Sequence, residues 1–228
     1  MTSPAGRAAP APGAAVALPR DFYRRTSLEV APALLNKVVA AGERSGRIVE
    51  VEAYLGPDDP ASHAFRGPTP RNGVMFGPAG HLYVYFSYGV HWCANVVVGP
   101  EGRGSAVLLR AGEVVVGEDL AHARRRAARV GRDLARGPAR LTQALAIGPE
   151  DKAADLLDPD SPVRLHRGPA PAAISAGPRV GISLATDLPW RFWETDAPSV
   201  SVFRAGGSGR GGRGGRQQSR AAGQDGAL

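Results

Sequence analysis

Cysteine is almost absent from this sequence, with Cys93 as the only one among 228 residues. A single thiol excludes an intramolecular disulfide and every zinc or iron–sulfur motif that is built from several cysteines. Because disulfides are typical of oxidising compartments, their exclusion favours a cytoplasmic protein.

Long apolar runs and lysines are also scarce. The sequence contains no stretch of about 18 apolar residues, so it predicts no membrane span and no membrane partner. The first 20 residues do not resemble a secretory signal, because Pro10 and Pro12 interrupt the apolar segment that a signal needs. The only lysines are Lys37 and Lys152.

The composition is that of a folded chain. Hydrophobic residues make up 43% and charged residues 21%, which excludes a chain disordered throughout. A length of 228 residues fits one domain with appendages, since domains usually span roughly 100 to 200 residues. We expect a disordered Ala/Pro-rich lead over residues 1–17, a single domain over 18–203, and a disordered Gly/Arg-rich basic tail over 204–228.

The positive charge lies mostly at the two ends. Of the formal charge of +7, residues 1–20 supply +2 and residues 204–228 supply +4, which leaves +1 for residues 21–203. The exception is residues 121–140, where seven arginines face only Asp133. This stretch suits contacts with phosphate or, equally, a solvated helix face.

Hydrophobic periodicity predicts an α+β fold with a curved antiparallel sheet flanked by helices. Alternating and β-branched segments predict strands over 47–54, 82–89, 93–98 and 105–111, with a hairpin at 99–104. Helical patterns span 27–35, 118–130 and 139–147. The first of these strands should be half-buried, with Glu50, Glu52 and Tyr54 on one face.

Several kinds of site fit these residues. Glu50 and Glu52 could serve a cleft or be ordinary exposed acids. Tyrosines near His63 suggest a stacking pocket for a flat ring, because buried hydroxyls need partners. A metal site could be formed by His81, His91 and Cys93, but the sequence has no metal-binding motif. His91 and Cys93 could also form a nucleophilic dyad, but the apolar run around Cys93 is more typical of an inert thiol in the core.

Longer motifs point to one family. The segments VEVEAYLGPDDPASH, TPRNGVMF, LYVYFSYGVHWCANVVV, AVLLRA and GPARLTQALAI occur in this order, followed by PRVGI and PWRF. Together they resemble the alkyladenine (3-methyladenine) DNA glycosylases over residues 18–202. The resemblance implies an enzyme of base-excision repair that flips a damaged purine out of double-stranded DNA and hydrolyses its N-glycosidic bond.

The resemblance assigns catalytic roles to two positions and an intercalating role to a third. Glu52 matches the carboxylate that activates the attacking water, and Arg110 matches a residue that helps to hold this water. Tyr88 matches the side chain that intercalates in place of the extruded nucleotide. On this basis, Glu50→Gln is expected to cost little activity. Strand cleavage is not expected, because a lyase needs an amine nucleophile and neither lysine lies among the motifs.

The base pocket is implied in the same way. Tyr54, His63 and Tyr85 match residues that sandwich the flipped base, and Asn95 matches a residue that discriminates against the guanine amino group. No metal and no cofactor are expected, and we expect a monomer. Two alternatives stay open: a non-catalytic nucleic-acid-binding module that uses the same surface, and an RNA-associated protein whose function lies in the tail.

Overall fold

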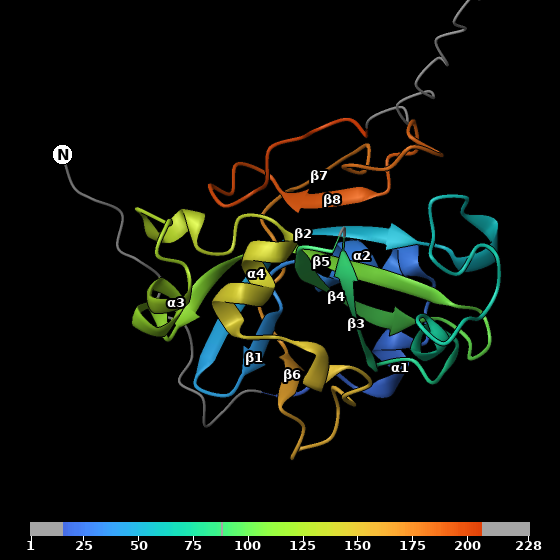
Figure 1. The fold of residues 1–228 in the computed structure, drawn as a ribbon, viewed down its shortest axis with the longest axis horizontal. Helices are drawn as coiled ribbons and strands as arrows, with labels where there is room; N and C mark the ends of the chain where they lie inside the picture. The colour runs from blue at the N-terminus through green and yellow to red at the C-terminus, as the bar shows by residue number, and fades with distance from the viewer. Residues whose placement is uncertain (1–15, 88, 207–228) are drawn as a thin grey trace, which may run out of the picture.

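One curled antiparallel sheet forms the centre of the chain (Figure 1). The structure is a computed structural model that describes residues 16–87 and 89–206. Its strands are β1 (Val38–Ala41), β2 (Arg44–Tyr54), β3 (Leu82–Ser87), β4 (His91–Val98), β5 (Ser105–Val116), β6 (Val163–His166), β7 (Ile174–Gly177) and β8 (Arg191–Glu194). Its helices are α1 (Arg20–Tyr23), α2 (Ser27–Leu34), α3 (Glu118–Arg124) and α4 (Pro138–Leu145).

The order of the strands makes β2 the centre of the sheet. Neighbours pair in the order β3-β4-β5-β2-β1-β6, and β8 pairs with both β2 and β7. β5 therefore lies along one edge of β2, while β1 and β8 share the other edge. This arrangement confirms the predicted α+β fold of one domain.

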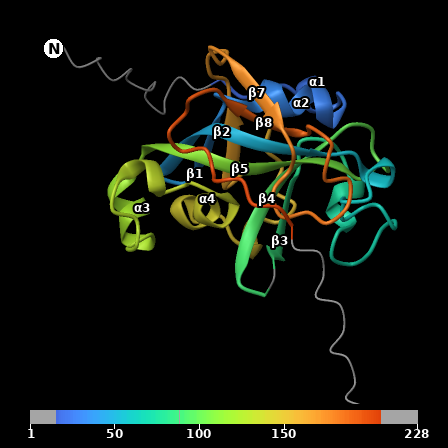
Figure 2. The same cartoon turned by 90° about the horizontal axis from the view of Figure 1, so that it is seen from above.

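Helices pack against the sheet from two sides of the molecule. In both views α3 and α4 lie together on one side, with α1 and α2 on the other (Figure 1, Figure 2). Val30 and Leu34 of α2 and Leu141 and Leu145 of α4 are fully buried in the main core. Within the described residues, no helix is long and apolar enough to cross a lipid bilayer.

Periodicity located most of the central elements correctly. The predicted strands fall within or largely within β2, β3, β4 and β5, and the predicted hairpin joins β4 to β5. The predicted helices over 27–35 and 139–147 correspond to α2 and α4. The predicted disordered segments, 1–17 and 204–228, lie almost entirely outside the described residues and stay predictions.

The predicted helix over 118–130 is wrong in its second half, because α3 ends at Arg124. Beyond this point the chain folds back and buries Leu134 and Ala135. Arg125 supports the turn, since its Nε donates to the backbone oxygen of Leu134 at 3.2 Å. The basic stretch is thus the end of α3, a connecting loop and the start of α4.

The expectation of a half-buried β2 is also wrong, because both of its faces are covered. Every residue from 48 to 53 is fully buried, including Glu50 and Glu52. Residues that come more than 120 positions later, among them Val180 and Ser201, cover the acidic face. Alternation in the sequence predicts which face is polar, but it does not reveal a distant segment that covers that face.

Candidate active site

A cavity of about 920 Å³ opens beside the acidic face of β2. Its walls come from β2 to β5, the loop after β2, the start of α4 and the chain beyond Arg179. The structure brings six predicted site residues together on these walls: Glu52, Tyr54, His63, Tyr85, Asn95 and Arg110. Tyr88, the seventh, lies outside the described residues.

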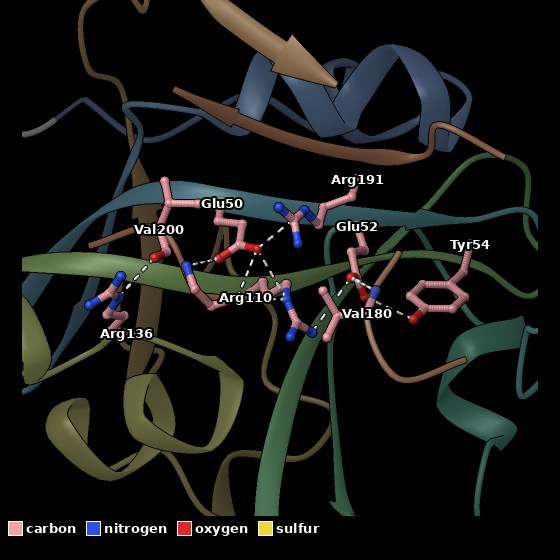
Figure 3. Close-up of polar contacts among 9 residues, drawn as sticks. Glu50, Glu52, Tyr54, Arg110, Arg136, Val180, Arg191 and Val200 are labelled. Atoms are coloured by element: carbon pink, nitrogen blue, oxygen red, sulfur yellow. Dashed lines mark hydrogen bonds and ion pairs between the residues drawn. The ribbon is translucent and has the colours of Figure 1, made fainter. Parts of the chain in front are cut away.

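Glu52 is buried on the cavity wall and is surrounded by donors (Figure 3). Its Oε1 accepts a hydrogen bond from the backbone nitrogen of Val180 at 2.7 Å. Its Oε2 accepts one from the Tyr54 hydroxyl at 3.0 Å. Nη1 of Arg110 lies 3.5 Å from Oε1. These donors stabilise a negative charge where burial alone would disfavour it.

Glu50 is enclosed by protein groups and is not an ordinary exposed acid. Nε of Arg110 donates to its Oε1 at 3.1 Å, while the backbone nitrogen of Ser201 donates to Oε2 at 2.7 Å. Burial raises the pKa of Glu50, and Arg110, Ser201 and Arg191 act in the opposite direction. The two glutamates therefore differ in access: Glu52 lines the cavity, whereas Glu50 is packed beside it.

Aromatic rings supply a stacking surface. Tyr83 and Tyr85 alternate along β3, as predicted, and their rings stack at 5.3 Å. His63 meets Tyr85 edge to face, with ring centroids 4.6 Å apart. Tyr54 lines the same cavity, so aromatic side chains from β2, β3 and the loop after β2 border the space that a flat ligand could occupy. Burial raises the pKa of Tyr54 and of Tyr85, so both hydroxyls stay neutral.

His63 and Asn95 complete the pocket lining. Burial lowers the pKa of His63, and the charge of Arg71 lowers it further. His63 is therefore a neutral ring at neutral pH, which suits contact with an electron-poor ligand. Asn95 is buried, and its Nδ2 donates to the backbone oxygen of Tyr83 at 3.3 Å, which orients the amide.

Arg179 supports Tyr54 and was missed by the analysis of the sequence. Its guanidinium pairs with Asp59 through contacts of 2.5 and 2.9 Å, and both side chains are fully buried. Its guanidinium carbon lies 4.7 Å from the ring centroid of Tyr54 and 5.0 Å from that of Trp190. Asp59 precedes Arg179 by 120 positions, so no local pattern could pair them.

Arginines lie at the edge of the cavity. Arg136 and Arg140, from the basic stretch, both line it at the start of α4. Arg136 is oriented by a hydrogen bond from its Nε to the backbone oxygen of Val200 at 2.9 Å. These cations fit the alternative in which part of the stretch contacts phosphate.

The metal and dyad alternatives find little support. In the described part of the chain, no group of three or more His, Cys, Asp or Glu side chains could hold a metal ion. His91 and Cys93 both line the cavity, but Cys93 is 3% exposed and burial raises the pKa of its thiol. A thiol that resists ionisation is a poor nucleophile.

These features define a class of protein: an enzyme of one α+β domain that sets a buried carboxylate beside a stacking pocket for a flat ring. The family model for methylpurine-DNA glycosylase (MPG) matches residues 21–198. A relative from Burkholderia lata is 54% identical over 184 residues, which cover 79% of this chain and 88% of the relative. One from Streptomyces avermitilis is 50% identical over 196 residues, covering 82% and 92%.

Both relatives carry the name "Putative 3-methyladenine DNA glycosylase". The chain therefore belongs to the methylpurine-DNA glycosylase family, which confirms the resemblance found in the sequence. It is an N-glycosylase that acts on DNA in the repair of alkylated purines.

Proposed function

We propose that this enzyme excises alkylated or deaminated purines from duplex DNA by flipping the damaged nucleotide into the cavity. A water activated by Glu52 then hydrolyses the N-glycosidic bond and leaves an abasic site. The observation that carries this proposal is the Glu52 carboxylate, which lies on the cavity wall beside the stacking surface with donors from Val180, Tyr54 and Arg110.

Recognition would depend on stacking and charge. The flipped base would stack between Tyr54 on one side and the His63–Tyr85 pair on the other. Stacking on aromatic rings contributes roughly 1–3 kcal/mol per base. A purine that carries a positive charge gains further attraction from electron-rich tyrosine rings, so alkylated bases are favoured over normal ones.

Bond cleavage would depend on the carboxylate. Departure of the base leaves an oxocarbenium-like sugar, which an anionic Glu52 stabilises while it accepts a proton from water. Arg110 would orient that water, because its Nη1 already lies 3.5 Å from Glu52. A cationic base is a good leaving group, so a second carboxylate is not needed for it.

Extrusion would depend on the tip of the β3–β4 hairpin. In the sequence, Tyr88 stands between Ser87, the last residue of β3, and His91, the first residue of β4. We assign it to intercalation, where it fills the gap that the nucleotide leaves. Arg136 and Arg140 would contact phosphates near the cavity.

The reaction would stop at the abasic site. A lyase step requires an amine that attacks the sugar, but Lys37 and Lys152 do not line the cavity. Nζ of Lys37 donates to the backbone oxygen of Gly168, and Nζ of Lys152 donates to that of Arg71. We further propose that the enzyme acts on double-stranded DNA as a monomer in the cytoplasm.

A product assay tests this function against the non-catalytic alternative. Duplexes with a single 7-methylguanine are incubated with excess enzyme, and the free base, abasic sites and strand breaks are quantified separately. We expect stoichiometric release of the base, with breaks only after alkali. Binding of the lesion without release of the base would support a non-catalytic binding module. Strand breaks that form at the same rate as the free base, together with a protein–DNA adduct trapped by borohydride, would show a lyase step and contradict a purely hydrolytic reaction.

A further inference from the structure

Arg110 is shared between two buried carboxylates on β2 (Figure 3). Its Nε donates to Glu50 at 3.1 Å, whereas its Nη1 lies at the longer distance of 3.5 Å from Glu52. The register of β2 against β5 shifts between Glu50 and Val51, which leaves Arg110 as an additional residue on β5. Such a bulge redirects a side chain, and here Arg110 contacts both acids.

The groups around Glu50 are suited to an anion. Its two oxygens face donors: Nε of Arg110, and both the backbone nitrogen and the Oγ of Ser201 at 2.7 and 2.9 Å. Nε of Arg191 on β8 lies 3.5 Å away and adds a second positive charge. Nε of Arg110 and the backbone nitrogen of Ser201 can only donate, so they favour the ionised form against the burial that raises the pKa of Glu50.

We propose that Glu50 is a positioning residue that holds Arg110 back from a close ion pair with Glu52 and so keeps Glu52 available as a base. The proposal rests on the proposed role of Glu52. If Glu50 lost its charge, Arg110 could turn fully toward Glu52 and form the short, charge-assisted contact that carboxylates prefer. A carboxylate held in that way accepts a proton from water less readily.

Glu50 also acts on Glu52 through its own charge. Two like charges that share one arginine repel each other, and Glu50 and Glu52 share Arg110 in this way. Among the described residues, other charged or titratable groups on these walls or beside the pair include Arg191 on β8, Tyr54 on β2, Tyr85 on β3, Cys93 on β4, Arg136 before α4, Arg140 in α4 and Arg204 after β8. Both the position of Arg110 and the charge of Glu50 act on Glu52 in the same direction. Removing Glu50 should therefore shift the acid side of the pH–rate profile to lower pH.

The test is the pH dependence of single-turnover excision of 7-methylguanine, whose departure needs no added proton. We expect Glu50→Gln to lower the plateau rate roughly 10-fold to 100-fold and to move the acid limb down by about one pH unit. Affinity for the lesion duplex should stay within about threefold. Glu50→Asp, which keeps the charge, should restore the wild-type acid limb. The enzyme is kept in excess over the DNA, so that a variant with a smaller folded fraction still gives the same single-turnover rate constant per bound duplex.

Glu113→Gln is the matched control, because Glu113 pairs with Arg47 at 2.6 Å away from the cavity. A role of Glu50 in stability alone predicts that both Gln variants unfold more easily and that both keep the wild-type acid limb, which would overturn the proposal. Glu52→Gln is measured in parallel. If Glu52→Gln abolishes excision but Glu50→Gln has the same acid limb in its pH–rate profile as the wild type, the proposed role of Glu50 is wrong and the proposed function stands. If Glu52→Gln keeps its rate, the proposed function fails and this role fails with it.

Discussion

Residues two positions apart on one strand have different surroundings and therefore different chemistry. Glu52 faces the cavity and is held by a backbone donor and a tyrosine. Glu50 is closed off by Ser201 and the two arginines. Alternation along the strand does not distinguish them, whereas the family match assigned the base to Glu52 and led us to expect little cost from Glu50→Gln. That expectation stays a prediction from the family match, and the full burial of Glu50 and its contact with Arg110 are the reason for the larger cost proposed above.

Arg179→Met should destabilise the fold by about 3–5 kcal/mol, because it leaves the buried carboxylate of Asp59 unpaired. Adding Asp59→Asn removes that charge, so the double variant should recover part of the loss. Urea unfolding of the wild type, both single variants and the double variant measures the coupling. A loss below about 1 kcal/mol for Arg179→Met would show that the pair adds little to stability.

His63 should remain neutral until the pH falls below its ordinary titration range, because burial and Arg71 both lower its pKa. Affinity for a cationic lesion should therefore weaken only in more acidic solution, where a charged His63 repels the base. Arg71→Gln removes one cause, so the pKa of His63 should rise and the loss of affinity should begin at higher pH. NMR titration of the ring resonance measures this directly. Arg66→Gln is the control, and an equal shift in both variants would contradict the assignment.

At the scale of elements, local patterns predicted the long strands and failed for the short ones. β2 and β5 span 11 and 12 residues, and the pattern within 47–54 and 105–111 was long enough for periodicity to detect them. β1, β6, β7 and β8 have four residues each, too few for such a pattern, and they were missed. The bulge that directs Arg110 toward both glutamates also depends on pairing between strands, which no single segment encodes.

The β3–β4 hairpin gives a prediction for its tip. Tyr88→Ala should slow excision about 10-fold or more for a lesion in a well-paired duplex, because the lost stacking is worth roughly 1–3 kcal/mol. The loss should shrink for a lesion opposite an abasic site, where unstacking is already cheap. Single-turnover rates on both duplexes measure the difference. Equal losses in both contexts would place Tyr88 in the pocket or the core instead.

At the scale of the whole molecule, arginines lie both at the edge of the cavity and on the surface outside it. Arg124, Arg126, Arg129 and Arg132 are exposed around the end of α3, while Arg136 and Arg140 line the cavity. Residues 207–228 add four arginines and one aspartate by sequence. Such charge strengthens binding to any duplex, whereas the selection of a lesion belongs to the pocket.

Removal of residues 207–228 should therefore weaken nonspecific DNA binding and flatten its dependence on salt. The slope of log K against log salt should fall by up to about three, since each neutralised phosphate contributes about 0.9. The cut spares Arg204, which lines the cavity and whose backbone oxygen accepts from Gly181 at 3.0 Å. Relative excision rates among lesions should stay the same. A changed order of lesions would contradict a purely electrostatic role for the tail.

The central claim is that Glu52 activates the water, and single-turnover excision by Glu52→Gln tests it most directly. The amide keeps the size of the side chain but cannot accept the proton or stabilise the developing positive charge, so the rate should fall at least 100-fold to 10,000-fold. Affinity for the lesion duplex should survive. Near-native excision by Glu52→Gln, measured with saturating enzyme on a 7-methylguanine duplex, would contradict the account.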